Sequence, residues 1–570
     1  MVSNLCAKRI KGVAPTLVLL ALLALQMQFN LLMAAENIPP AWQRVDESAA
    51  LARQSQHSNE RMHFRLINSS VLDKNTLWQG FQSQLTAFGE QRYQALKPLI
   101  IEASIAQLQQ AIAAGELSYE ELVSFYLYRI RLYESDNSLS LNALIATNPE
   151  ALTLAQALDR QVQAGSLKPT ENSIVGMPIL LKDNIGSSGM ATTAGALALQ
   201  ENLAADAFIS INLKRSGAII LGKTNLSEWA YFFCDGCPLG YSALGGQTLN
   251  PYGRLQFETG GSSSGSAVAV AANFAVAAVG TETSGSILSP ASANSVVGLK
   301  PTTGALSRSG IVPISSTLDT PGPISRTVAD AVLLFNAMSG FDEADSAMPL
   351  ISADMQLDVR AVNINGMRLG YLTTLAEHQR YGELYTRALS VLELNSAQLT
   401  QLTLASSDLT GFSEFLGAQM KVDLASYLRQ QNSVESNMHS VSQLRDYNLA
   451  NPKQRIPYGQ GRFDAIAQMT ISPEEAEQLG EQLQSQARTV LDGAFAQHDL
   501  DILLSINNSH AALAALANYP ALTLPLGYTD AGQPVGLTLL APSFHEQDLI
   551  NLAVQIERLL ALRKPPVDYP

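Results

Sequence analysis

The chain has 570 residues, of which 46% are hydrophobic and 15% charged, and it carries a formal net charge of -14. This composition predicts a large buried core and excludes an intrinsically disordered protein. Nucleic-acid binding is not expected, because the chain is acidic and shows no cluster of basic residues. No long linker of proline, serine and glycine interrupts the sequence, so we expect one large domain with appendages.

The first 35 residues have the pattern of a secretory signal peptide. Basic residues come before an apolar run at 13–25, and Ala34 and Ala35 precede Glu36, the expected start of the mature protein. We therefore expect an exported protein, periplasmic or secreted, with no membrane association after the signal is removed. The alternative is an uncleaved membrane anchor, in which the apolar run would span the bilayer.

Residues 36–97 are polar with scattered aromatic side chains, which predicts a mostly helical N-terminal extension. After Ser104, apolar residues recur at helical spacing until Gly115, which ends the first helix. Ser118 and Glu121 then form a capping box that opens a second helix. Two amphipathic helices thus come before the central part of the chain.

Short apolar runs alternate with helical segments in the rest of the chain, after a helix expected at 149–163. This alternation predicts an α/β fold with a central sheet. The segment 351–500 is rich in Gln, Glu and Leu at helical spacing, so we expect a helical layer that shapes access to a site. The expected strands are residues 179–181, 218–221, 276–279, 502–505 and 522–525.

Residues 217–224 match the P-loop pattern letter for letter and end in Gly222, Lys223 and Thr224. In a P-loop the four middle residues curl so that their N–H groups surround a phosphate. Here those residues are the apolar run 218–221, which we expect to be a strand. The motif therefore does not predict nucleotide binding.

Two cysteines remain after removal of the signal, Cys234 and Cys237. In an oxidising compartment this pair predicts a small local disulfide. Two cysteines alone do not make a zinc site. We expect neither a metal ion nor a cofactor.

Two turns rich in glycine and serine, residues 260–266 and 280–286, dominate the sequence. Glycine permits close approach of the backbone, so such turns can expose a serine and aim several amides at one point, as attack on a carbonyl requires. The small apolar residues 267–273 between them predict a buried helix. Both turns therefore lie at ends of buried elements, where a site is held rigid.

A lysine in an apolar segment, Lys182 at the end of the run 179–181, is the third feature. A serine hydroxyl needs a base, and lysine can act as one only when uncharged, although its ordinary pKa is about 10.4. The apolar residues before Lys182 predict delivery of the amine into a low-dielectric site. Asp183 would point to the other face of a strand. Together these features indicate a serine hydrolase that uses lysine as its base.

Residues 261–265 also fit the G-x-S-x-G nucleophile elbow, which would make Ser263 the nucleophile and His510 or His545 the base. The elbow requires an apolar strand immediately before it. Residues 252–259 are instead a polar loop, so we favour the lysine mechanism.

The two serine turns and the segments that continue from them resemble the amidase signature family. The similarity extends from about Glu102 to Met338, and it returns near the C-terminus. Segments 223–230, 245–248 and 280–283 most resemble the peptide amidase branch. The remaining matches are Pro290-Ala291-Ser292, Gly298-Leu299-Lys300-Pro301-Thr302, 519–523 and 532–537.

The resemblance implies an amidase signature fold at 98–565, with a central, mostly mixed β-sheet covered by helices on both faces. It implies that Ser286 is the nucleophile, that Ser262 is a bridging serine after a cis peptide bond, and that Lys182 is the base. The backbone donors of the oxyanion hole would be Thr283, Ser284 and Gly285. The chain departs from the common family pattern at Glu282, Ser284 and Leu288, where many members carry aspartate, glycine and arginine.

The resemblance implies hydrolysis of carboxamide C–N bonds through an acyl-enzyme, with C-terminal peptide amides or small aryl or aliphatic amides as substrates. One alternative is the glutamine-hydrolysing subunit of a tRNA-dependent amidotransferase, which the export signal opposes. Another is a secreted, non-catalytic peptide-binding protein, which the intact Lys182, Ser262 and Ser286 oppose. We expect an amide substrate as the partner, and neither nucleic acid nor a membrane.

Overall fold

The computed structural model describes residues 38–349, 352, 355–359, 364–431 and 438–570. The expected signal peptide lies outside these residues. Within them, no helix is long and apolar enough to span a bilayer.

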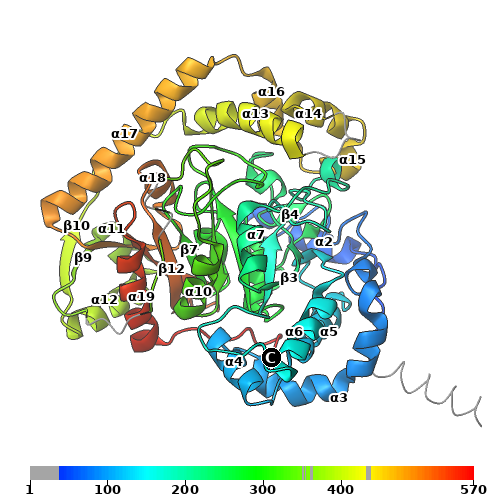
Figure 1. The fold of residues 1–570 in the computed structure, drawn as a ribbon. Helices are drawn as coiled ribbons and strands as arrows, with labels where there is room; N and C mark the ends of the chain where they lie inside the picture. The colour runs from blue at the N-terminus through cyan, green and yellow to red at the C-terminus, as the bar shows by residue number, and fades with distance from the viewer. Residues whose placement is uncertain (1–37, 350–351, 353–354, 360–363, 432–437) are drawn as a thin grey trace, which may run out of the picture.

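The described residues build a central sheet of 11 strands (Figure 1). Strand β2 pairs in parallel with β3 and β6, whereas β8 pairs antiparallel with β6 and β7. The predicted α/β fold with a mixed central sheet is therefore confirmed. In sheet order the strands are β1 (Leu144–Thr147), β3 (Ile219–Thr224), β2 (Pro178–Lys182), β6 (Ala277–Glu282), β8 (Thr320–Ser325), β7 (Val297–Lys300), β12 (Ala521–Tyr528), β13 (Pro534–Leu540), β11 (Ile502–Ile506), β9 (Arg368–Leu372) and β10 (Gln398–Leu402).

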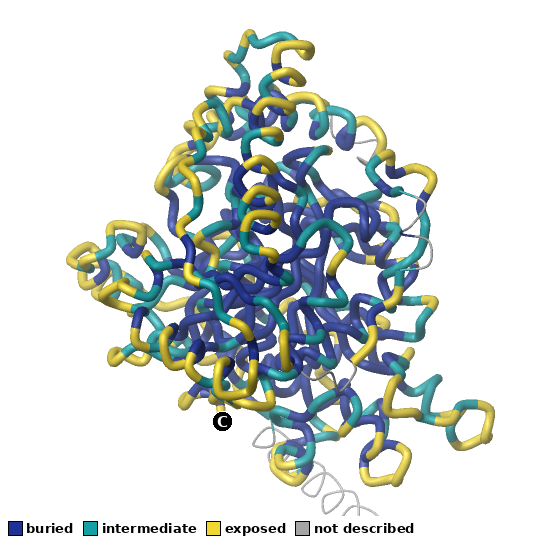
Figure 2. The backbone as a smooth tube through the Cα atoms, turned by 90° about the vertical axis from the view of Figure 1, so that its left-hand side faces the viewer, coloured by how far each residue is buried: buried dark blue, intermediate teal, exposed yellow. Residues whose placement is uncertain are grey.

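Helices cover the sheet and bury its central strands (Figure 1). Helices α8 and α9 pack against each other and the sheet, while α10 packs against α7, α19 and the sheet. Every residue of β2, β3 and β6 is buried, as expected for strands covered on both faces. Figure 2 shows this buried centre, with exposed residues on the outer turns. These helices are α7 (Phe208–Arg215), α8 (Ser264–Ala271), α9 (Leu288–Ala293), α10 (Val328–Met338), α18 (Ala511–Leu516) and α19 (Glu546–Leu560).

The N-terminal segment contains α2 (Ser48–Gln54), three short 3₁₀ helices and α3 (Gln82–Ile100) among its described residues. One of the 3₁₀ helices, Lys74–Leu77, contacts the edge strand β1, so this segment covers an edge of the sheet. The next helices are α4 (Ile105–Ala113), α5 (Tyr119–Glu134) and α6 (Ala151–Gln163). The predicted capping box of Ser118 and Glu121 opens α5.

The segment predicted to be a helical layer is not helical throughout, because β9 and β10 extend the central sheet at its far edge. The sequence does not reveal β10, since Gln398 and Gln401 are exposed on this edge strand and interrupt any apolar run. Helix α12 (Gly382–Leu394) packs against β10, β12 and α19. The later helices of this segment lie at the top of Figure 1, over the loops of the central sheet. They are α13 (Phe412–Gln431), α14 (Val441–Leu449), α15 (Pro452–Arg455), α16 (Gly461–Gln468) and α17 (Pro473–His498).

Two local expectations are met. Residues 219–224 of the P-loop match form β3 and lie in the sheet beside β2, so they do not curl around a phosphate. Cys234 and Cys237 form a disulfide with their Cα atoms 5.9 Å apart.

Candidate active site

Lys182 is the last residue of β2, and its side chain is completely buried. Its Nζ lies 2.8 Å from Ser262 Oγ and 2.8 Å from Thr281 Oγ1, and it donates to the Thr281 carbonyl at 3.1 Å. Strands β2 and β6 are neighbours, so Thr281 of β6 lies directly beside the amine. The amine is thus hydrogen-bonded to two hydroxyl groups and a backbone carbonyl, and not to a carboxylate.

Burial lowers the pKa of Lys182 to about 7, although the negative charges of Asp319 and Glu282 oppose this shift. The cause is the loss of water around the ammonium form. Asp183 binds elsewhere, with Oδ1 3.1 Å from the ammonium of Lys223. The expectation that Asp183 faces away from Lys182 is therefore confirmed. Near neutral pH, Lys182 can be an uncharged base.

The serine turn 260–266 brings Ser262 to this amine. The peptide bond between Gly261 and Ser262 is cis, as the family resemblance implies. The carbonyl of Ser262 accepts a hydrogen bond from the N–H of Ser227 at 3.1 Å. The side chain and the backbone of Ser262 are both buried and fixed.

Ser286 follows β6 and the turn 283–285 and comes just before α9. Its carbonyl accepts from the N–H of Ser263 at 3.1 Å, which places the two serine turns side by side. The Ser286 residue is 8% exposed, and its hydroxyl makes no hydrogen bond with another residue that the structure describes. The structure therefore joins Lys182 and Ser262 through their side chains, and it brings Ser286 beside them through the backbone.

The alternative nucleophile Ser263 turns its hydroxyl into the sheet, where it donates to the Thr281 carbonyl at 3.1 Å. His510 is bound to Ser505, and His545 is bound to Asp548. Among the described residues, neither histidine is hydrogen-bonded to Ser263. The nucleophile-elbow hypothesis therefore finds no support in the geometry.

The turn 283–285 contains the three predicted oxyanion donors. Gly285 has φ 85°, and a Cβ at this position would lie 3.0 Å from Asn508 Nδ2, so the turn requires glycine. Glu282 accepts from the N–H groups of Ile287 at 2.7 Å and Leu288 at 3.0 Å. This carboxylate closes the turn between the end of β6 and the start of α9, a role that the sequence did not reveal.

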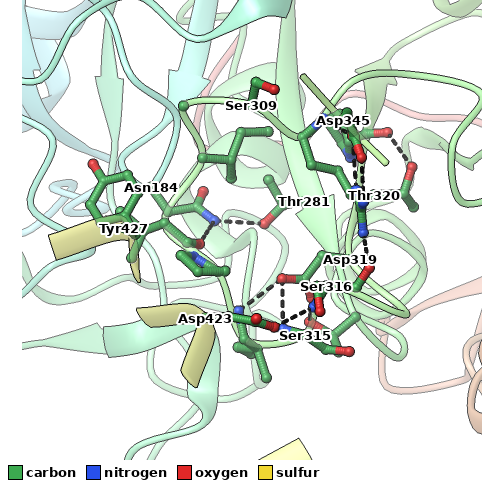
Figure 3. A pocket seen from close by; sticks show the side chains of 18 of the residues that line it. Asn184, Thr281, Ser309, Ser315, Ser316, Asp319, Thr320, Asp345, Asp423 and Tyr427 are labelled. Carbon is green, nitrogen blue, oxygen red and sulfur yellow. Dashed lines mark hydrogen bonds and ion pairs between the residues drawn. The ribbon is translucent and has the colours of Figure 1, made fainter. Parts of the chain in front are cut away.

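A polar network behind the turn was also missed by sequence reasoning. Thr283 donates to Asp319 Oδ1 at 2.5 Å, and the other oxygen of Asp319 accepts from the N–H groups of Ile314 and Ser315 at 2.8 and 2.9 Å. Asn184 donates to Thr281 Oγ1 at 3.0 Å. Figure 3 shows Asn184, Thr281 and Asp319 of this network around one hollow.

That hollow is a cavity of about 260 Å³ beside the catalytic candidates. Thr281 and Thr283 line this cavity. Because Thr281 Oγ1 also contacts Lys182 Nζ, the side chain of Thr281 lies between the amine and the cavity. The loop 308–319, the first residues of β8 and helix α13 form much of the rest. A group bound there would lie beside both Lys182 and the turn 283–285.

Comparison with known proteins identifies the family. A model of the family described as Amidase matches residues 121–550. This chain belongs to the amidase family. It is therefore an amidase, an enzyme that hydrolyses amide C–N bonds, and the resemblance noted in the sequence is confirmed.

The relatives of this amidase include proteins named as amidases and proteins named as amidotransferase subunits. A probable amidase of Arabidopsis thaliana is 35% identical over 82% of this chain and 92% of its own length. A glutamyl-tRNA(Gln) amidotransferase subunit from Prochlorococcus marinus is 30% identical over 81% of this chain and 99% of its own.

Solved structures share the fold of the amidase. An amidase family protein from Bacillus anthracis has a TM-score of 0.81 and 35% identity, with 88% of this chain and 99% of that chain covered. The native peptide amidase from Stenotrophomonas maltophilia has a TM-score of 0.74 and 37% identity, with 82% and 98% covered.

Proposed function

We propose that this amidase hydrolyses carboxamides through an acyl-enzyme on Ser286, with Ser262 as the bridging serine and Lys182 as the base. The observation that carries the proposal is the 2.8 Å contact between Lys182 Nζ and Ser262 Oγ in a fully buried site. A neutral amine there can accept the proton of Ser262 while Ser262 takes the proton of Ser286.

In the first step, the oxygen of Ser286 bonds to the carbonyl carbon and its proton passes through Ser262 to Lys182. The carbonyl oxygen becomes an oxyanion, which the N–H groups of the turn 283–285 stabilise. This step requires the Ser286 hydroxyl to approach Ser262, and catalytic hydrogen bonds commonly tighten only when substrate is bound.

In the second half, the oxyanion collapses, the C–N bond breaks, and the proton returns through Ser262 to the departing ammonia or amine. Water then attacks the ester at Ser286, and its proton travels along the same relay. The serine leaves with that proton, which restores the starting state and releases a carboxylic acid.

Peptide amides with a C-terminal carboxamide are the substrates we propose, and small amides are the wider class. This choice is supported by the likeness to a peptide amidase at 37% identity and by the cavity beside the turn, which has room for a side chain. Glutamine hydrolysis is the second candidate, because a relative named as part of a glutamyl-tRNA(Gln) amidotransferase matches along nearly its whole length.

The test is ammonia release from four groups of substrates: peptide amides, amino-acid amides, aryl amides and glutamine. The proposal expects turnover of peptide amides, and no turnover by the Ser286→Ala or Lys182→Ala variants. Turnover of glutamine alone would favour the second candidate. A protein that neither turns over amides nor reacts with a fluorophosphonate probe would be non-catalytic.

We also propose that the chain is exported by its first 35 residues. Cell fractionation and N-terminal sequencing test this proposal. A mature N-terminus near Glu36 in the exported fraction supports it, and retention of the full chain in the cytoplasm contradicts it.

A further inference from the structure

The cavity beside the oxyanion turn has an unbalanced set of charges. Among the described residues that line it, the charged ones are Arg308, Asp319, Asp345 and Asp423. Arg308 and Asp345 form an ion pair with two contacts, one of them 2.9 Å from Nε to Oδ2. These two charges therefore neutralise each other, and two aspartates remain.

Neither Asp319 nor Asp423 forms an ion pair with a lysine, arginine or histidine in the described part of the chain. Asp319 is held by neutral donors, the Thr283 hydroxyl and two backbone N–H groups. Asp423 Oδ2 accepts from the N–H of Ser316 at 2.6 Å. Burial raises the pKa of both aspartates, although the positive charge of Arg308 opposes this shift. Loss of water around a carboxylate that has no direct ion pair is costly, so a positive group that entered the cavity would relieve that cost.

The acidic character continues outward from the cavity. A groove of about 650 Å³ between α13 and α17 shares Ser316 and Asp423 with the cavity, and Glu477 and Glu481 also line it. Its one lysine among the described lining residues, Lys421, donates to the Met469 carbonyl at 2.7 Å. A chain that leaves the cavity along this groove therefore meets more carboxylates than cations.

We infer that the cavity binds a positively charged group of the substrate, so that the enzyme prefers amides whose acyl part carries an ammonium or guanidinium group. This inference rests on the proposed hydrolysis of peptide amides and specifies the substrate class. Asp423 is the specificity-determining residue. It lines the cavity from α13 and lies outside the oxyanion turn, so its charge can be removed without disturbing that turn. Asp319 holds the turn through Thr283, so its replacement would disturb catalysis as well as charge.

The experiment measures kcat/KM for acetylated dipeptide amides that carry lysine, norleucine or glutamate at the last or the preceding position. Lysine and norleucine are similar in size and differ in charge. At one of the two positions, the lysine peptide should exceed the norleucine peptide by about tenfold, which lies between the effects of exposed and buried ion pairs. The glutamate peptide should be poorer than both.

Two variants locate the effect. Asp423→Asn keeps an acceptor for Ser316 and removes one negative charge, so the lysine-to-norleucine ratio should fall to near one. Glu414→Gln removes the same charge from an exposed position on the same helix, away from the cavity, and the ratio should stay as in the parent enzyme. The pair separates local recognition from the attraction of cations by a chain of net charge -14. The ratio is measured within each enzyme preparation, so partial loss of folded protein does not change it.

Equal kcat/KM values for the lysine and norleucine peptides at both positions would overturn the inference, and so would an unchanged lysine-to-norleucine ratio in Asp423→Asn. Turnover of the norleucine peptide would in either case still support the proposed function. If no amide is hydrolysed, the proposed function fails, and calorimetric binding of the same two peptides decides the inference. Tighter binding of the lysine peptide that depends on Asp423 supports it, and equal binding contradicts it.

Discussion

The hydroxyl of Thr283 donates to Asp319 at 2.5 Å and so ties the turn 283–285, the proposed oxyanion hole, to the loop that lines the cavity. The other carboxylate oxygen of Asp319 accepts hydrogen bonds from the N–H groups of Ile314 and Ser315. The position of the turn therefore depends on a carboxylate that comes from another part of the chain.

Thr283→Val keeps the shape of the side chain and removes its hydroxyl. The turn should lose its fixed position, so kcat should fall by about tenfold or more, since a hydrogen bond to a charged group is worth about 1.5–3 kcal/mol. KM should change less, because the donors act on charge that develops during the reaction. Steady-state kinetics test this, with the exposed Thr489→Val as the control. Equal losses of kcat in the two variants would contradict the proposed role of the link.

Lys182→Arg tests whether the amine acts as a base. Arginine cannot lose its proton in a protein, so turnover should fall by about 100-fold or more even if the fold is retained. Lys168→Arg changes an exposed lysine and should leave kcat/KM as it is. Near-normal turnover by the Lys182→Arg enzyme would show that the amine is not the base.

The three neighbouring serines should respond differently to replacement by alanine. Ser286→Ala removes the nucleophile, so turnover and labelling by a fluorophosphonate should both disappear. Ser262→Ala should reduce turnover by about 10²–10⁴-fold, because water can replace part of a lost relay. Ser263→Ala should lower stability, since its hydroxyl bonds Thr281, yet Ser286 should still be labelled. Mass spectrometry of the labelled protein identifies the modified serine, and a label on Ser263 would favour the nucleophile elbow.

The burial of Lys182 should make stability depend on pH. The folded-state pKa of Lys182 is lowered to about 7, while the unfolded value is about 10.4. Between these values the unfolded state binds more protons, so the cost of burying Lys182 is full below pH 7 and fades as the pH rises toward 10. Lys182→Met should therefore raise Tm most at pH 6–7 and least near pH 10. Thermal melting at several pH values checks this, and a Tm difference that does not change with pH would contradict the shift.

Much of the architecture could be predicted because the decisive signals are local. The apolar run before Lys182 indicated a buried strand, and Ser118 with Glu121 indicated the start of a helix. The two serine turns stood out because glycine and serine cluster in sequence where the backbone must turn tightly. Strand β10 was missed because packing at the sheet edge, and not an apolar pattern, defines it.

The partners of the site residues could not be predicted in the same way. Thr283 and Asp319 are 36 positions apart, and Ser316 and Asp423 are 107 apart. Nothing in the local sequence links such residues, because the crossing of strands and the placement of α13 bring them together. Glu282 is nearer in sequence to its partner Ile287, five positions away, but its place at the end of β6 gives no local sign of this role.

The central claim is that an uncharged Lys182 draws a proton through Ser262 so that Ser286 can attack. The most direct test is the rate of fluorophosphonate labelling of Ser286 as a function of pH, measured in the parent enzyme and in Lys182→Ala. The account predicts that labelling of the parent accelerates as the pH rises through about 7, the pKa of Lys182, and that the variant labels slowly at every pH. A rate that is independent of pH between 5 and 9 in the parent, or equal in the two proteins, would contradict it.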